Sequence, residues 1–335
     1  MFSRLRRRRV WLHAWCPLLL VLLAAAFFAS LLAGPLELSP SQVLALLLGK
    51  EESSTAAAVV HRIRLPRALL AALVGGGLGA SGAAFQAVLR NPLAEPYILG
   101  VSGGAALGAV AALVLGTGAG WLPPAAFVGA FGALGLVYLT ARAHRTSPHT
   151  LILAGVMVGS LATALLLFLL WIAPVGAVRS ALFWLTGDLS AADAAWLGPA
   201  SLWFAFGLAA LWLQAPALDL LTQGEETAAD LGLAVGRSRL CIFAAAGALT
   251  AAAVALAGLI GFVGLVVPHV VRLLWGPEHR RLLPASALLG AAFLVAADAL
   301  SRALLAPGEI PVGVITALLG APFFLYLLRS REVEG

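Results

Sequence analysis

Acidic side chains that could serve acid–base chemistry or bind a metal are gathered in one short stretch of the chain. Four of the fifteen Asp and Glu residues fall within twelve positions: Asp219, Glu225, Glu226 and Asp230. General acid–base catalysis or metal binding would need a His or Cys placed to work with them. None lies near this stretch, and the only two cysteines, Cys16 and Cys241, stand far apart. The sequence therefore predicts no catalytic site, no metal site and no bound cofactor.

A nucleotide-binding loop is missing as well. The Walker A loop has the pattern G-x-x-x-x-G-K-[ST], in which glycines and a lysine hold the phosphates. The single lysine, Lys50, is followed by Glu51, and no glycine stands five positions before Gly49. If ATP drives this protein, another chain must bind it.

The composition is that of a membrane protein. Hydrophobic residues make up 61% of the chain, charged residues 11%, and the mean hydropathy is +1.00. A bilayer core of about 30 Å is crossed by roughly 20 helical residues, and many apolar runs reach that length. A β-barrel would show short alternating segments instead. The net charge of +6 is interpreted as a signal of membrane orientation rather than of nucleic-acid binding.

The apolar runs predict an all-α, polytopic membrane protein that forms a single transmembrane domain over residues 1–335. We expect ten spans, at 11–33, 65–89, 97–117, 121–141, 150–172, 195–216, 240–257, 259–275, 282–304 and 311–328. The stretch 240–275 is nearly continuous, but one helix of that length would be about 54 Å long, too long for one crossing. We therefore expect a break near Gly258 or Gly261.

Basic residues predict the orientation, since positive charge is enriched in cytoplasmic loops. The basic tail 1–10 precedes an apolar stretch that is too long for a signal peptide and suits a spanning helix. With the tail inside, fifteen Lys and Arg residues are cytoplasmic and six are outside. Both termini are then cytoplasmic. The outside cluster HRIRLPR, residues 61–67, is an exception that needs a reason.

In this topology the acidic stretch lies in the cytoplasmic connection 217–239. Thr222 and Glu225 fit a capping box at a helix start. Acids in the first turn favour the helix dipole, and Gly232 suits the position just after a helix end. The predicted helix is about two turns long. It is too short to span and must lie on the membrane face or meet a partner.

Two glycine- and proline-rich segments allow more than one interpretation. In 90–105, RNPLAEPYILGVSGGA, the prolines stop a helix and favour either a tight reversal or a pore constriction. In 73–86, small residues at Gly75, Gly79 and Ser81/Gly82 favour close helix packing or a cavity wall. Gln86 at the end of that stretch is placed to bond across helices.

Ionisable groups inside membrane spans are functional candidates, and this chain has few. His269 follows Pro268 and either bonds backbone freed by the proline or has a functional role. Asp298 and Arg302 are four residues apart and are predicted to pair on one helix face. Arg64, Arg67 and Arg302 either reach towards lipid headgroups or form a docking surface for an acidic partner.

Several stretches together resemble the permease subunits of bacterial ABC importers for iron–siderophores, haem and cobalamin, the FecCD/BtuC-like family. They cover most of the chain after residue 60, in the family's order: RLPRALLAALVGGGLGASGAAFQAVLRNPLAEPYILGVSGGA, LILAGV, FWLTGDLS, GEETAADLG, GLIGFVGLVVPHVVRLLWGPEHRRLLPAS and EIPVGVITALLGAPFFLYLL.

The resemblance implies a type II ABC importer permease fold in the bacterial inner membrane, with no catalytic activity of its own. It implies a homodimer of ten-helix subunits in the lipid bilayer, two ABC ATPase subunits on the cytoplasmic side, a periplasmic or lipid-anchored substrate-binding protein outside, and no nucleic acid. It also implies a translocation path at the two-fold axis.

The resemblance assigns roles to three sets of residues. The cytoplasmic connection 217–239 is expected to couple the permease to the ATPase, and we call it the coupling segment. Its contacts to the ATPase are expected from Gly224, Glu225, Glu226, Ala228, Leu231 and Gly232. Docking of the binding protein is expected from Arg64, Arg67 and Arg302. Cytoplasmic gates are expected at Asn91, Pro92 and Leu93 and at Thr146, Ser147, Pro148 and His149, where the Pro-His pair departs from the small hydroxyl residues typical of the family.

The function we expect is ATP-driven import of a metal chelate by alternating access, with an iron–siderophore as first choice and haem or cobalamin next. An ion-gradient-driven secondary transporter and an integral-membrane enzyme are the alternatives. The first would transport without an ATPase. The second would show clustered His, Asp or Glu at one membrane face, which the sequence does not contain.

Overall fold

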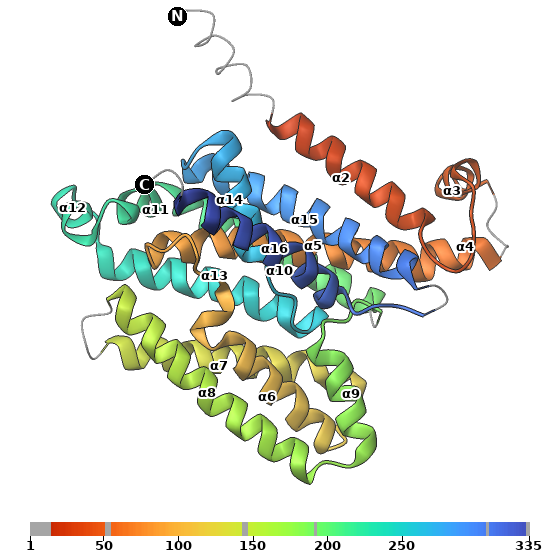
Figure 1. Ribbon diagram of the computed structural model, residues 1–335, viewed down its shortest axis with the longest axis horizontal. Helices are drawn as coiled ribbons and strands as arrows, with labels where there is room; N and C mark the ends of the chain where they lie inside the picture. Colours follow the sequence, from red (N-terminus) through yellow and green to blue (C-terminus); the bar gives the residue numbers. More distant parts are fainter. Residues whose placement is uncertain (1–14, 51–54, 143–146, 191–192, 306–307, 333–335) are drawn as a thin grey trace, which may run out of the picture.

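A computed structural model gives the fold and describes residues 15–50, 55–142, 147–190, 193–305 and 308–332. All the regular structure in these ranges is helical (Figure 1). The predicted all-α class is therefore confirmed. Thr146, one of the predicted gate residues, and the basic tail 1–10 lie outside the described residues.

Each of the ten predicted spans coincides with a helix. These are α2 (Trp15–Leu32), α5 (Leu65–Val88), α6 (Val101–Val114), α7 (Leu122–Arg142), α8 (Pro148–Ile172), α10 (Ala194–Leu213), α13 (Val235–Ala257), α14 (Val263–Trp275), α15 (His279–Leu304) and α16 (Val312–Glu332). Within the described residues, seven helices are long and apolar enough to cross a membrane, and α6, α14 and α16 are shorter apolar helices. The break predicted near Gly258 or Gly261 is confirmed, because α13 ends at Ala257 and α14 begins at Val263.

Shorter helices connect these spans, and sequence reasoning expected only one of them. They are α3 (Pro40–Leu47), α4 (Thr55–Val59), η1 (Val60–Arg64), η2 (Pro96–Leu99), η3 (Ala119–Trp121), α9 (Val175–Leu185), α11 (Ala215–Thr222) and α12 (Glu225–Asp230). The start of α3 carries a readable signal, since Ser39 and Gln42 form a capping box there. Helix α9 follows Pro174 and is too short for a spanning pattern.

Helix α5 lies at the centre of the fold, packed against α15, α13, α14 and α10. Its glycines allow this approach. A Cβ atom at Gly75 would overlap the backbone oxygen of Gly290, and one at Gly79 would overlap that of Ser286. The packing interpretation of the small-residue spacing is thus confirmed, because both contacts join α5 to α15.

Gln86 bonds across helices as predicted. Its Nε2 donates to the carbonyl oxygens of Gly264 and Leu265 on α14, both at 3.3 Å. Its Oε1 accepts a hydrogen bond from Arg272 at 3.0 Å. The end of α5 is therefore fixed to both ends of α14.

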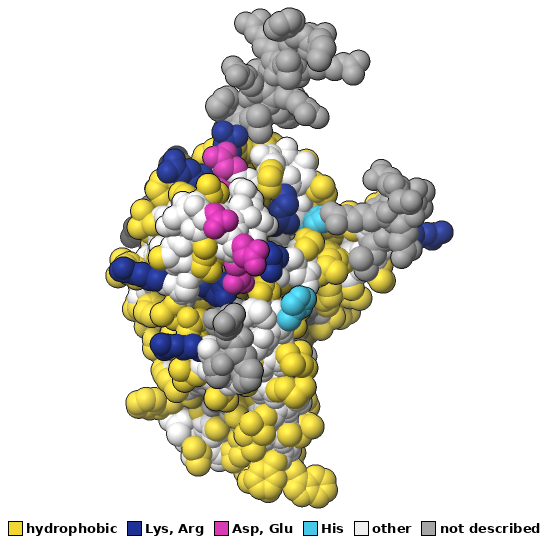
Figure 2. Space-filling model, turned by 90° about the vertical axis from the view of Figure 1, so that its left-hand side faces the viewer, with side chains coloured by type: hydrophobic (Ala, Val, Ile, Leu, Met, Phe, Trp, Pro, Cys, Tyr) yellow, Lys and Arg dark blue, Asp and Glu magenta, His cyan; other side chains and the backbone are white. Residues whose placement is uncertain are grey.

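The molecule has two distinct ends along its long axis (Figure 1). Helices α11 and α12 and the C-terminal part of α16 lie at one end, which we call the α12 end. Helices α3 and α4 lie at the other, the α3 end. Figure 2 shows the α12 end face on, with Arg, Asp and Glu side chains gathered over it and hydrophobic side chains along the flanks. Charge at the ends and apolar flanks between them are what a bilayer requires.

Candidate functional site

The coupling segment forms a compact pair of short helices that projects from the α12 end. Helix α11 ends at Thr222, Gly224 turns the chain with φ 119°, and α12 follows from Glu225. Gly232, with φ 86°, ends α12 as predicted. The N–H groups of Gly232 and Leu233 bond the carbonyls of Ala229 and Ala228 at 2.8 and 2.9 Å, which is a complete Schellman ending.

The predicted capping box is wrong. The Thr222 hydroxyl donates to the carbonyl oxygen of Asp219 at 2.7 Å within α11, and no side chain caps α12. The reason is Gly224, whose backbone conformation separates two helices where the sequence pattern suggested one. Glu225 and Glu226 still occupy the first turn of α12, where they favour the helix dipole.

Two acids of the cluster anchor this helix pair to the membrane helices. The Asp219 carboxylate accepts hydrogen bonds from the backbone N–H of His279 at 3.0 Å and from its ring Nδ1 at 2.6 Å. It therefore caps the start of α15 from α11. Glu225 forms an ion pair with Arg239, a buried residue of α13. The helix pair is consequently fixed to α13 and α15.

The remaining predicted contact residues divide by exposure. Glu226 and Gly232 are exposed, and Leu231 is 61% exposed although it is apolar. Gly224 and Glu225 are half-buried. Ala228 is fully buried, so its side chain packs inside the segment and offers no contact surface in this conformation. An exposed apolar side chain next to an acidic one suits a protein contact, and the contact roles stay predictions.

The three predicted docking arginines meet at the α3 end, and all are buried, with 3%, 6% and 4% of Arg64, Arg67 and Arg302 exposed. Arg64 donates to the carbonyl oxygens of Leu31, Leu32 and Leu36 at 2.7, 3.2 and 2.6 Å. These acceptors lie at the end of α2 and just after it. Arg64 therefore satisfies helix-end carbonyls that lack partners within α2.

Arg67 and Arg302 share the fully buried carboxylate of Asp298. Arg67 Nε lies 2.9 Å from Asp298 Oδ1, and Arg302 Nη2 lies 3.1 Å from Oδ2, which confirms the predicted Asp298–Arg302 pair. Arg67 Nη1 also lies 2.7 Å from Glu309, whose position the sequence reasoning did not single out. The guanidinium groups of Arg67 and Arg302 are thus paired with acids of the same chain. Docking of a binding protein through them stays a prediction, and it would require these arginines to leave their present partners for acids of that protein.

The first predicted gate lies in residues 90–100, which we call the gate segment. The Asn91 side chain accepts a hydrogen bond from the N–H of Leu93 at 2.9 Å, and Pro92 and Leu93 are exposed. Gly100, with φ 76°, then starts α6. The backbone therefore reverses tightly, which fits one of the two interpretations left open for this segment. The gate role stays a prediction.

Sequence reasoning missed two polar side chains of the gate segment. Glu95 accepts a hydrogen bond from the N–H of Phe262 at 2.7 Å, and Tyr97 bonds both backbone groups of Ile260. Burial raises the pKa of the Glu95 carboxyl, and the bond from Phe262 acts against this. In the sequence, the only sign of this role was Glu95 itself, an acid followed by proline in an otherwise apolar chain.

The second predicted gate is described at three of its four residues. Ser147 caps α8, accepting a hydrogen bond from the N–H of Thr150 at 3.2 Å, and Pro148 occupies the first turn. His149 is exposed and Pro148 is buried. The local geometry of this segment is that of a helix start, and its gate role stays a prediction.

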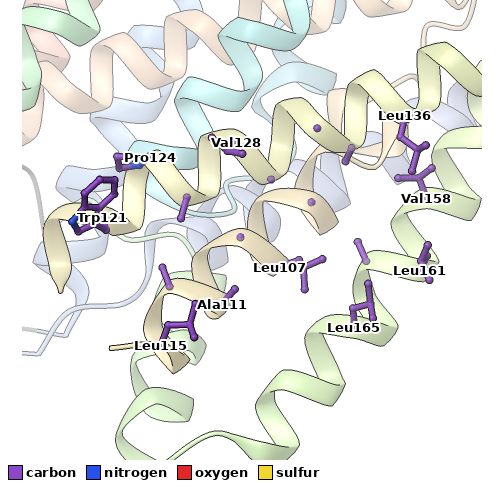
Figure 3. Close-up of a pocket in the computed structure, with 18 of the residues that line it drawn as sticks. Leu107, Ala111, Leu115, Trp121, Pro124, Val128, Leu136, Val158, Leu161 and Leu165 are labelled. Carbon is purple, nitrogen blue, oxygen red and sulfur yellow. The ribbon is translucent and has the colours of Figure 1, made fainter. Parts of the chain in front are cut away.

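One cavity in the described part of the chain is lined almost entirely by apolar side chains. It has a volume of about 630 Å³ and lies between α6, α7 and α8, and its labelled lining in Figure 3 consists of Leu, Ala, Val, Pro and Trp side chains. Such a groove suits acyl chains or another helix.

The ring of His269 on α14 packs edge-on against the ring of Phe324 on α16, with the ring centroids 6.1 Å apart.

The described residues hold no group of three His, Cys, Asp or Glu side chains close enough to bind a metal. The polar side chains instead bond the backbone ends of helices or one another. Charged side chains are exposed at the α12 end, whereas the three arginines of the α3 end are buried.

Comparisons with known proteins agree with this arrangement. The chain is 49% identical over 283 residues to a cobalamin import system permease of Halobacterium salinarum, covering 84% of this chain and 76% of the relative. It is 39% identical over 320 residues to an Fe(3+)-citrate import system permease of Bacillus subtilis, covering 93% and 95%. A solved metal-chelate type ABC transporter in an inward-facing conformation superposes with a TM-score of 0.84 at 34% identity, covering 93% and 97%.

The model of the FecCD transport family matches residues 22–330, nearly the whole chain. The relatives match over most of their own length, so the similarity concerns the entire fold rather than one motif. The chain therefore belongs to the FecCD transport family and is a multi-pass permease of the ABC-importer type.

Proposed function

We propose that this chain, as a homodimer, forms the membrane path of an ATP-driven importer for a metal chelate. The observation that carries the proposal is the coupling segment, a charged pair of short helices that projects from an otherwise apolar membrane protein and is fixed to α13 and α15. Two ATPase subunits bind there, on the cytoplasmic side, and a substrate-binding protein docks at the α3 end. Both termini are then cytoplasmic.

Cobalamin is the first substrate to test, with iron–siderophore, iron–citrate and haem next. The reason is that a cobalamin permease is 49% identical to this chain, against 39% for the Fe(3+)-citrate permease. This order replaces the preference for siderophores drawn from the sequence.

Reconstitution in liposomes tests the proposal. The permease is assembled with its ATPase and binding protein, and uptake of cobalamin and of a ferric siderophore is measured with and without ATP. We expect ATP-dependent uptake of one chelate class. Uptake by the permease alone, driven by an ion gradient, would instead establish the secondary-transporter alternative.

A further inference from the structure

The connection between α13 and α14 has an unusual backbone. Gly258 adopts φ 68° and ψ −158°, a region that residues with side chains avoid. Phe262 adopts φ 68° although it is not a glycine. Among the described residues, the other non-glycine with a positive φ is Arg90, at the start of the gate segment. Unusual backbone conformations persist only where the surrounding structure holds them. Gly258 and Phe262 stand at the two ends of the α13–α14 connection, and Arg90 stands at the start of the gate segment.

Two side chains of the gate segment hold this connection. The N–H of Ile260 donates to the Tyr97 hydroxyl at 3.0 Å, and that hydroxyl donates to the Ile260 carbonyl at 2.9 Å. The N–H of Phe262 donates to Glu95 at 2.7 Å. Backbone groups at an interruption between helices lack helical partners and must find others away from water. Here Glu95 and Tyr97 supply them from a segment more than 160 residues away in the sequence.

The connection also lies against other elements. A Cβ atom at Gly320 of α16 would overlap Phe262, and the N–H of Asp188, just after α9, bonds the carbonyl of Ala257 at 2.8 Å. Gly264 at the start of α14 leaves room for Pro96, next to Glu95. Because packing is this close, the connection cannot shift without moving the gate segment and α16.

A continuous helix joins this junction to the coupling segment. Arg239 pairs with Glu225 of α12 near the start of α13, and α13 runs unbroken for 23 residues to Ala257. A helix of this length spans about 35 Å. A displacement of α12 is therefore carried to the junction by a rigid element.

We propose that Glu95 and Tyr97 are positioning residues that make the α13–α14 connection and the gate segment move as one body. Movement of α12 and α13 then reaches Asn91–Leu93. The inference rests on the proposed function, since it describes how an ATPase bound to the coupling segment displaces the gate. Neither side chain needs to touch the transported chelate.

Hydrogen–deuterium exchange on the purified chain tests the contact without requiring transport. Glu95→Ala removes one hydrogen bond to the connection and Tyr97→Phe removes two. We expect each variant to raise hydrogen exchange in peptides covering 258–264 by at least about five- to tenfold. Glu95→Gln keeps an acceptor oxygen and should exchange as the native chain does. Tyr138→Phe is the matched control, because the Tyr138 ring packs on Phe243 away from the junction. Unchanged exchange in both Glu95→Ala and Tyr97→Phe would overturn the contact.

The ratio of ATP hydrolysed to chelate transported, measured on the reconstituted complex, tests the coupling role. We expect Glu95→Ala and Tyr97→Phe to raise this ratio several-fold, with Glu95→Gln near the native value. A merely structural role would lower hydrolysis and transport together and leave the ratio unchanged, which would overturn the proposal. Absence of transport by the native complex would contradict the proposed function instead. If Glu95→Ala does not fold, Tyr97→Phe decides both measurements.

Discussion

Asp298 is a fully buried acid that serves two buried arginines, Arg67 and Arg302. A charge inside a membrane protein is costly unless it is paired, and removing one partner leaves the other uncompensated. Arg302 also donates to the backbone of Ala33 and to Ser30, so the cluster ties α5 and α15 to the end of α2. At the residue scale, this acid determines whether the α3 end is held together.

Asp298→Asn should therefore lower the free energy of unfolding by about 3–5 kcal/mol, the typical cost of breaking a buried pair. Thermal unfolding in detergent measures the loss. Glu309→Gln is the control, because Glu309 is an exposed partner of the same Arg67, and its loss should cost about 1 kcal/mol or less. Equal losses of unfolding free energy in the two variants would show that the buried position of Asp298 does not increase its contribution to stability.

At the scale of elements, the glycines divide into those at helix contacts and those facing outwards. Gly75 of α5 lies directly against the backbone of α15, whereas nothing lies within 4 Å of a Cβ atom built on Gly132 of α7. Both are within helices, and α7 has an exposed apolar surface typical of a lipid-facing helix. The same residue type thus allows close packing at one position and has no packing role at the other.

Gly75→Ala should destabilise the fold by about 1–3 kcal/mol, since the added methyl group forces α5 and α15 apart. Gly132→Ala should be neutral or stabilising by up to about 1 kcal/mol, because alanine favours the helix and meets no neighbour. Unfolding temperatures of the two variants in the same detergent check both values. A stable Gly75→Ala protein would contradict the close approach of these helices.

The two acids at the start of α12 have different surroundings. Glu225 is engaged with Arg239, whereas Glu226 points to an exposed surface. Glu226→Lys should weaken binding of the ATPase while leaving the fold intact, and the loss should shrink at high salt because exposed charges are screened. Binding to the purified ATPase at two salt concentrations measures this. Glu37→Lys makes the same charge change at the α3 end and should have no effect. Equal binding by the native chain and Glu226→Lys would remove Glu226 from the contact.

At the scale of the whole molecule, the two ends differ in what they present. The α12 end carries the exposed acids of the coupling segment and surrounding arginines (Figure 2). The α3 end carries the buried arginine cluster and the exposed apolar residues Leu44 and Leu47 of α3. The positive-inside rule predicts that the α12 end faces the cytoplasm.

Thiol labelling tests this orientation. In a chain with Cys16 and Cys241 replaced by serine, Leu44→Cys or Leu231→Cys introduces one thiol at a site that is 53% or 61% exposed. A membrane-impermeant maleimide added outside intact cells should label Leu44→Cys and leave Leu231→Cys unlabelled until the cells are opened. The reverse pattern would invert the topology.

The sequence by itself determined the features that depend on neighbouring residues. Hydropathy predicted the ten spans, helix length predicted the break near Gly258, and four-residue spacing predicted the Asp298–Arg302 pair. The ending of α12 at Gly232 was also readable, because glycine alone adopts that conformation without strain. The division between α11 and α12 was not, since Gly224 and the capping pattern of Thr222 favoured different helix starts.

Only the tertiary structure decided which distant groups meet. Asp219 with His279, Glu95 with Phe262 and Arg67 with Glu309 are each separated by 60 or more residues. The burial of Ala228 and of the docking arginines likewise depends on what packs over them. The physical reason is that hydropathy and spacing describe one helix at a time, whereas burial and pairing depend on which helix surfaces face one another.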